Sequence, residues 1–160
     1  MRRFAGAQAH DWTILIRIMV GAVFVPEGVQ KLVFPAILGA GRFAKIGIPW
    51  PDLMGPFVGV VEIACGTLIL LGLFTRLAAI PLIVVMIVAL LSTKVPILLG
   101  RDFLIFHPAS LPRYGAWSAA HEARTDLCML LACLYLLAAG PGRWSLDARL
   151  APGKERTRVD

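Results

Sequence analysis

The sequence has few of the residues on which metal, nucleotide and disulfide sites depend. It contains three cysteines and three histidines in 160 residues, with no CxxC motif and no histidine pair at HxxxH spacing. An odd number of scattered cysteines gives no disulfide framework. Nothing resembles a phosphate-binding loop, a dinucleotide-binding glycine motif or a Ser-His-Asp constellation. We therefore expect no metal site, and we expect Cys65, Cys128 and Cys133 to act as small apolar residues within helices.

Charged residues are also scarce, at 16% of the chain, and long apolar runs take their place. Apolar residues make up 58% of the sequence and the mean hydropathy is +0.77, whereas ordinary soluble domains have about 45–50% apolar residues. A membrane-spanning helix needs about 20 apolar residues to cross roughly 30 Å of hydrocarbon. Four segments reach that length, and we expect helices over about residues 12–34, 54–74, 77–99 and 118–140.

This pattern predicts an all-α membrane protein whose residues 1–150 form one four-transmembrane-helix bundle, followed by a flexible charged tail at 151–160. With four spans both termini share one side, and more Lys and Arg residues fall there than on the other side. The side of the termini holds Arg2, Arg3, Arg76, Arg143, Arg149, Lys154, Arg156 and Arg158, and the other side holds Arg42, Lys45, Arg101 and Arg113. We therefore predict that both termini are cytoplasmic. This topology accounts for the net charge of +6, so we expect the lipid bilayer, and no nucleic acid, as a partner.

Some charged residues near the ends of these segments have a simple explanation. Arg17 lies near the inner end of the first segment and Lys94 near the outer end of the third. Long basic side chains in such places commonly extend to the lipid headgroups, and we expect both to do so. Thr75, in the short turn between the second and third segments, is expected to cap the helix that follows.

Other charges are expected deeper in the membrane and at a common depth. At 1.5 Å per residue, Glu27, Glu62 and Asp126 fall roughly 10 Å below the outer surface, with Lys31 and Glu122 above them. Three separate segments thus deliver acidic groups to one layer in the outer half of the bundle. Charged groups inside membranes are costly and usually functional.

The spacing of these charges predicts a network. Glu27 and Lys31 share a helix face at i,i+4, as do Glu122 and Asp126. We expect Lys31 and Arg124 to neutralise several of the four acids, leaving at least one carboxyl group to hold a proton or bind a ligand. The ligand-binding or proton-relay candidates are Glu27, Lys31, Glu62, Glu122, Arg124 and Asp126. Alternatively, the same residues only hold the helices together.

Several stretches of the sequence resemble the DoxX family of small four-helix bacterial membrane proteins. They are "RIMVGAVFVPEGVQKLVFP", "GIPWP", "VGVVEIACGTLILLGLFTRLAA" and "GPGRWSLDARL". Together they extend the resemblance from Trp12 to Leu150. The positions that match the family pattern are Gly28, Lys31, Leu32, Gly47, Pro49, Glu62, Gly66, Gly72, Thr75, Arg76 and Glu122.

The resemblance implies a multi-pass protein of the bacterial inner (plasma) membrane, linked to quinone or oxidative-stress systems. A quinone or another small lipophilic ligand would then bind at the charged layer. Glu62 or Glu122 would exchange a proton with it, and Lys31 or Arg124 would stabilise an oxyanion. Because the chain has no recognisable flavin, haem or iron–sulfur motif, electrons would come from a soluble oxidoreductase partner, and this chain would be a subunit of a quinone-linked oxidoreductase.

Two other functions fit the same residues. In one, the protein is a proton-coupled carrier of a small solute, which four helices without a detectable repeat would achieve only as a homo-oligomer. In the other, it is a non-catalytic scaffold subunit of a membrane complex. Binding of a quinone analogue would separate the redox hypothesis from both.

Overall fold

The computed structural model describes residues 12–150, and in this range the chain is helical without a β-strand. The all-α fold is as predicted. The predicted tail at 151–160, Arg2 and Arg3 lie outside the described residues. The helices are α1 (Thr13–Val33), α2 (Ala40–Ile46), α3 (Pro51–Leu71), α4 (Thr75–Ala89), the π-helical turn η1 (Leu90–Lys94), α5 (Val95–Leu99), α6 (Ala116–Ala139) and α7 (Leu146–Leu150).

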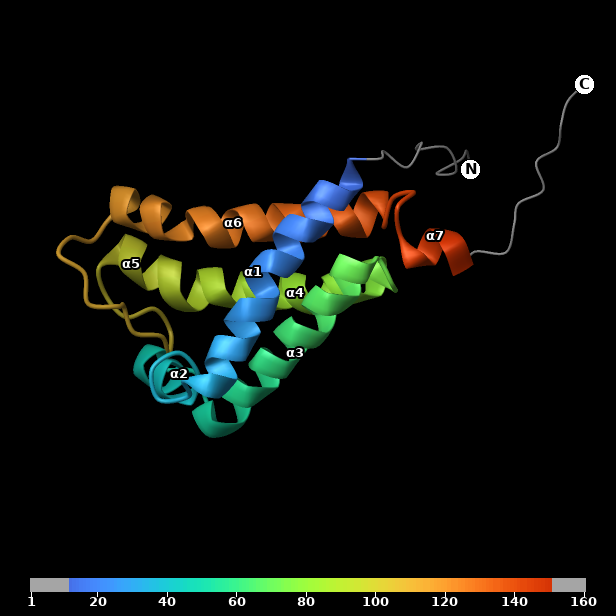
Figure 1. Cartoon of the computed structure of the whole chain (residues 1–160). Helices are drawn as coiled ribbons and strands as arrows, with labels where there is room; N and C mark the ends of the chain where they lie inside the picture. Colours follow the sequence, from blue (N-terminus) through green and yellow to red (C-terminus); the bar gives the residue numbers. More distant parts are fainter. Residues whose placement is uncertain (1–11, 151–160) are drawn as a thin grey trace, which may run out of the picture.

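The long helices form two antiparallel pairs (Figure 1). In one pair α1 packs along α3, and in the other α6 packs along α4. The helices α4, η1 and α5 make one continuous rod, Thr75–Leu99. We call the end of the bundle near α2 the α2 end, and the opposite end, near α7, the α7 end.

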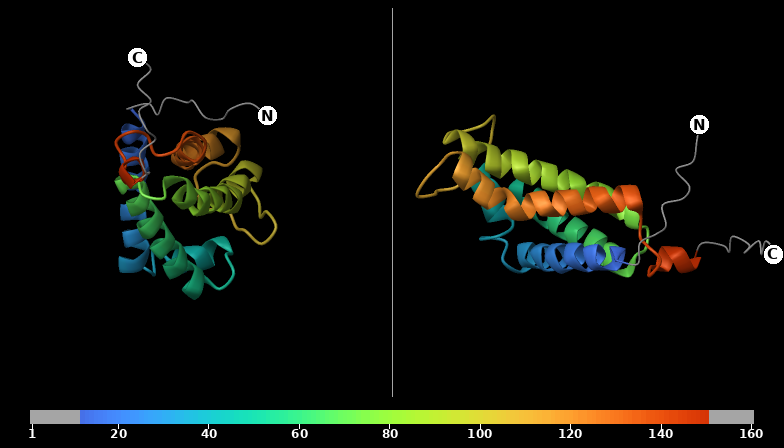
Figure 2. Two further views of the ribbon diagram at one scale, coloured as in Figure 1. Left: turned by 90° about the vertical axis from the view of Figure 1, so that its right-hand side faces the viewer. Right: turned by 90° about the horizontal axis from the view of Figure 1, so that it is seen from above.

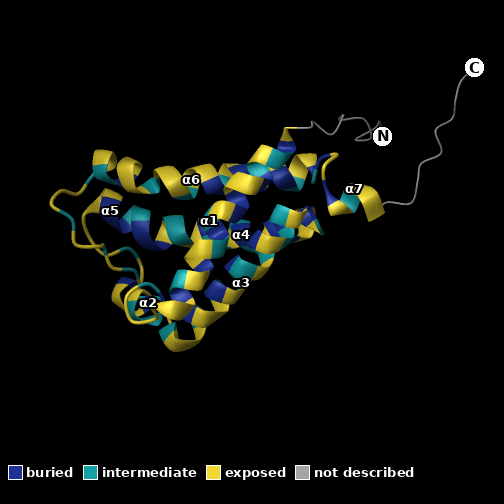
Figure 3. Cartoon of the chain, viewed as in Figure 1, coloured by how far each residue is buried: buried dark blue, intermediate teal, exposed yellow. Residues whose placement is uncertain are grey.

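Three helices of the described chain are long and apolar enough to cross a membrane: α1, α3 and the Thr75–Leu99 rod. They contain 21, 21 and 25 residues, respectively. Exposed residues recur along these helices (Figure 3). They include apolar residues such as Ile18, Phe57 and Val84. Helix α6 is also long, with 24 residues, but it carries Glu122, Arg124 and Asp126 and is not among these candidate spans.

The main apolar core occupies the half of the bundle next to the α7 end. There all four long helices meet around buried side chains, namely Val20, Phe24, Ile69, Ala78, Ala79, Leu82, Met86, Met129, Ala132, Cys133 and Leu136. Towards the α2 end the two pairs diverge (Figures 1 and 2), and η1 and α5 pack against α6 and α4. The segment 100–115 crosses back to α2, where the backbone N–H of His107 donates to the carbonyl of Ile46 at 3.1 Å.

Arg17 does not extend to the headgroups as expected. Its side chain is buried, with 3% of the residue exposed. The guanidinium donates to the carbonyl oxygens of Ile69 at 2.8 Å and Leu70 at 2.5 Å, which belong to the last turn of α3. It also reaches the carbonyls of Trp144 at 2.5 Å and Pro141 at 3.4 Å. Arg17 therefore ties α1 to the end of α3 and to the segment after α6, because a guanidinium carries enough donors to satisfy several helix-end carbonyls at once.

The N-terminus of α4 is capped by α7 and not by Thr75. The Asp147 carboxylate accepts the N–H groups of Phe74 at 2.8 Å and Thr75 at 3.1 Å. A negative charge at a helix N-terminus is favourable because the first N–H groups are otherwise unpaired. The expected cap was wrong because Thr75 lies inside the helix, where its buried hydroxyl finds no partner among the described residues. Gly72, in the turn before α4, allows Arg17 and Ser145 to pack against the backbone, because a β-carbon at this position would clash with both.

We predict that Arg17→Lys lowers the free energy of unfolding by about 2–3 kcal/mol. A lysine ammonium cannot reach the carbonyls of α3 and those of the segment after α6 at the same time, so some of these buried carbonyls would lose their donor. Denaturation in mixed detergent micelles measures the change. The matched control is Arg76→Lys, since Arg76 makes one exposed hydrogen bond to Ala138; a change within about 0.5 kcal/mol is expected there. Equal effects of the two substitutions would contradict the structural role of Arg17.

Candidate functional site

Glu27 and Glu62 lie on the same faces of their helices as residues of the apolar core. Glu27 is seven residues beyond Val20 on α1, and Glu62 is seven residues before Ile69 on α3. Seven residues are nearly two helical turns, so each pair points in the same direction within about 20°. Val20 and Ile69 are completely buried in the core. The two acids therefore lie on core-facing surfaces, but nearer the α2 end, where the helix pairs have separated.

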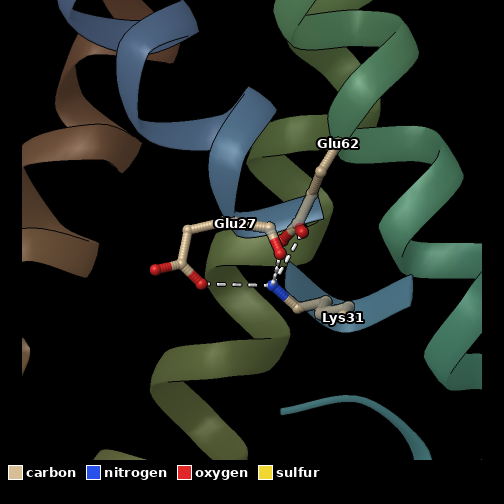
Figure 4. Close-up of polar contacts among 3 residues, drawn as sticks. All are labelled: Glu27, Lys31 and Glu62. Atoms are coloured by element: carbon tan, nitrogen blue, oxygen red, sulfur yellow. Dashed lines mark hydrogen bonds and ion pairs between the residues drawn. The ribbon is translucent and has the colours of Figure 1, made fainter. Parts of the chain in front are cut away.

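Three charged side chains from α1 and α3 meet there, and we call Glu27, Lys31 and Glu62 the charged trio (Figure 4). The Lys31 ammonium lies 2.7 Å from Glu62 Oε2 and 3.4 Å from Glu27 Oε2. The side chains of Glu62 and Lys31 are 3% and 11% exposed, whereas that of Glu27 is 51% exposed. The trio thus has a buried ion pair on one side and an accessible carboxylate on the other.

Two glycines allow the buried pair to form. A β-carbon on Gly28 would lie 2.5 Å from the carbonyl oxygen of Gly59, and one on Gly59 would lie 3.0 Å from the carbonyl oxygen of Gly28. The backbones of α1 and α3 therefore approach more closely than other residues would permit, a common device in membrane helix packing. Because the two helices are antiparallel, Lys31 and Glu62 lie one turn to opposite sides of this contact, and the close approach lets their long side chains meet across it.

The trio carries two carboxylates for one ammonium. In a medium of low dielectric constant the attraction between Lys31 and Glu62 is strong enough to offset much of their lost hydration. Arg42 of α2 adds a weaker electrostatic attraction on Glu62. Glu27 is farther from the ammonium and more exposed, so it is the member of the trio best placed to accept a proton or a hydrogen bond from another molecule.

Asp126 belongs to a second polar site on the other helix pair. Its carboxylate lies 3.2 Å from the ammonium of Lys94, with the two side chains 24% and 13% exposed. Asp126 is seven residues before the buried Cys133 and so also lies on a core-facing surface. The expected headgroup position of Lys94 is therefore not what the structure shows.

The π-helical turn η1 explains how Lys94 reaches Asp126. Such a turn inserts one extra residue into a helix and rotates the residues that follow. In η1 Ser92 and Thr93 are both buried, and Lys94, the next residue, reaches Asp126. Thr93 donates its hydroxyl to the carbonyl of Ala89 at 2.6 Å.

Glu122 and Arg124 lie on the surface of α6 and contact neither the trio nor each other. Arg124 donates to the carbonyl of His121 in its own helix at 2.5 Å. Glu122 lines an open pocket of about 350 Å³ formed with Leu111, Pro112, Arg113, Trp117, Ser118 and His121. The expected single network of six residues is thus divided into the trio, the Lys94–Asp126 pair and two surface residues.

The cysteines occupy three different environments. Cys133 is buried in the main core, Cys65 packs against that core, and Cys128 is exposed on α6. All three are free thiols. Within residues 12–150, no group of three or more His, Cys, Asp or Glu residues has a geometry that could hold a metal ion.

Comparison with known proteins agrees with the sequence motifs. The DoxX family model matches residues 12–95, which contain α1, α3 and the whole charged trio. The "Uncharacterized membrane protein Rv3486" of Mycobacterium tuberculosis is 49% identical over 149 residues, covering 93% of this chain and 87% of that protein. The chain belongs to the DoxX family. The match confirms the resemblance and, with the apolar helices, identifies an integral membrane protein.

A more distant relative carries a functional name. "Putative oxidoreductase CatD" of Bacillus subtilis is 25% identical over 148 residues, covering 92% of each chain. No solved structure matches this chain.

We predict that Lys31 and Glu62 are energetically coupled. Lys31→Met alone should cost about 3 kcal/mol of unfolding free energy, because it leaves the buried Glu62 carboxylate unpaired. Adding Glu62→Gln should recover part of this loss, giving a coupling energy of about 1–3 kcal/mol in a double-mutant cycle. The exposed Lys45 of α2 provides the control, and Lys45→Met should have little effect. Additive effects of Lys31→Met and Glu62→Gln would show that the two side chains do not pair in the folded protein.

Proposed function

We propose that this DoxX protein spans the bacterial plasma membrane four times, with both termini in the cytoplasm and α6 as the fourth span. Helix α6 has the length of a span. C-terminal to its charged residues it exposes apolar side chains such as Leu127, Leu131 and Leu134. Its charges reside near the α2 end, where Asp126 pairs with Lys94. Pairing lowers the cost of placing a charged helix in hydrocarbon.

Exposed aromatic residues at both ends of the bundle support this placement. Trp12, Phe74 and Trp144 are 74%, 61% and 65% exposed at the α7 end. Trp50 and Trp117 are 75% and 91% exposed at the α2 end. Aromatic side chains favour the two membrane–water interfaces. Arg76, Arg143 and Arg149 lie at the α7 end, and the sequence near the two termini adds five Lys and Arg residues, against four Lys and Arg residues on the other side. We therefore expect the α7 end to face the cytoplasm.

The topology is testable with reporter fusions in a bacterial host. Green fluorescent protein fused after residue 160 should fluoresce, because it folds in the cytoplasm, and alkaline phosphatase fused there should be inactive. Alkaline phosphatase inserted in the 100–115 segment should be active. The reverse pattern would overturn the orientation, and an active phosphatase at both sites would overturn the count of four spans.

We further propose that the charged trio binds a small lipophilic ligand of the quinone and hydroquinone type, and that the protein is the membrane component of a redox system. The observation that carries this proposal is an accessible carboxylate, Glu27, beside a buried ion pair that joins two candidate membrane spans, α1 and α3. Reduction of a quinone takes up a pair of electrons and a pair of protons. Electrons would come from a soluble oxidoreductase partner, and the trio would position the ligand and pass protons to it.

Thermal unfolding of the purified protein with decylubiquinone, in its oxidised and its reduced form, tests the site. Saturation with at least one form should raise the midpoint by several degrees, because a ligand that binds the folded state stabilises it. Glu62→Gln should remove the rise, since it releases Lys31 from its buried partner, whereas Lys45→Gln on α2 should preserve it. Absence of a rise with both forms in the wild type would favour the scaffold role, in which the charges only join the helices.

A further inference from the structure

The three N–H donors of the Lys31 ammonium are matched by three oxygen atoms of the chain. These are Glu62 Oε2 at 2.7 Å, Glu27 Oε2 at 3.4 Å and the Glu27 carbonyl oxygen at 3.4 Å. A quinone carbonyl, which only accepts hydrogen bonds, would have to displace one of these oxygens. The sequence-based expectation that Lys31 stabilises an oxyanion therefore conflicts with this arrangement.

Glu27 offers the opposite chemistry. One of its carboxylate oxygens points to Lys31 and the other points away (Figure 4). That second oxygen, Oε1, makes no hydrogen bond to any of the described residues. An ionised carboxylate only accepts hydrogen bonds, so a molecule that contacts Glu27 must donate one.

The direction of approach follows from the burial along α1. Val20 and Phe24 are covered by the core at 0% and 1% exposure, whereas Glu27, on the same face, is half exposed. Beyond the α2 end, the contact between His107 and Ile46 holds the 100–115 segment against α2. Access from the bilayer, between the two helix pairs, is consistent with both observations.

We propose that the ligand of the trio is a membrane-resident amphiphile with a phenolic hydroxyl, which enters from the bilayer and donates its hydrogen bond to Glu27 Oε1. This inference rests on the proposed function and specifies its ligand. The site selects the hydroxylated, reduced form of a quinone-type molecule over the oxidised form, because the reduced form alone carries a donor.

The test compares two probes that differ only in the donor hydrogen, 4-nonylphenol and 4-nonylanisole, with protein in lipid nanodiscs. Binding is followed by tryptophan fluorescence. The phenol should bind about tenfold more tightly, as expected for one hydrogen bond to a charged acceptor. Glu27→Leu should abolish this preference. The matched control is Glu122→Leu, which removes another exposed acid at a different place and should leave the preference intact.

The outcomes separate the inference from the proposed function. The inference would be overturned if the two probes bound equally, if the preference persisted in Glu27→Leu, or if it disappeared in Glu122→Leu. In each of these cases the proposed function would still stand if decylubiquinone gave a thermal shift that depends on Glu62. No binding of either probe would overturn the inference, and loss of the decylubiquinone shift as well would overturn both.

The route of entry has its own measurement. A phospholipid with a diazirine in its acyl chain, irradiated with wild-type protein in liposomes, should label residues around Glu27 on the core-facing side of α1. It should also label the outward-facing Ile18 and Met19, which serve as the positive control. Labelling of Ile18 and Met19 alone, or crosslinks from the Glu27 region to a second copy of the chain, would overturn entry from the bilayer.

Discussion

The contact between the Lys31 ammonium and Glu62 Oε2 at 2.7 Å determines how the rest of the α2 end is arranged. Each of these charges alone would be very unfavourable inside a membrane-spanning pair of helices. Together they are tolerated, provided that α1 and α3 lie close enough and in one register. Gly28 and Gly59 supply that closeness, and the pair in turn prevents the helices from sliding along each other. Glu27 is then left with a shared and more distant partner.

The two ends of the bundle are built on different principles. At the α7 end all four long helices meet in one apolar core, and Arg17 and Asp147 satisfy the helix-end carbonyls and N–H groups of the turn between α3 and α4. At the α2 end the helix pairs separate, and each pair carries its own ion pair. A well-packed end thus supports an end with polar surfaces, which is the arrangement that a binding site requires because its groups must stay in place when unoccupied.

The sequence was sufficient to predict three apolar helices of spanning length and the family, because these depend on hydrophobic length and on local motifs. The i,i+4 pairing of Glu27 with Lys31 is of this kind. Partners across helices were harder to predict. Lys94 could be assigned to Asp126 only with the rotation caused by η1, and a π-helical turn has no reliable sequence signature. Arg17 was misjudged because its long side chain can reach either the headgroups or the carbonyls of a neighbouring helix, and only the packing of α3 decides between them.

The charges at the α2 end also favour the proposed binding site over simple packing of the helices. Lys94 and Asp126 compensate each other, and Lys31 compensates Glu62 at short distance. What remains is Glu27, whose carboxylate shares that same ammonium at 3.4 Å and stays half exposed. Packing of α1 against α3 requires the Lys31–Glu62 pair and the close glycine contact. Glu27 places a second negative charge beside that pair, which is unfavourable for the Glu62 carboxylate. A half-exposed carboxylate with one oxygen directed away from the ion pair is best explained by the ligand that we propose for the trio.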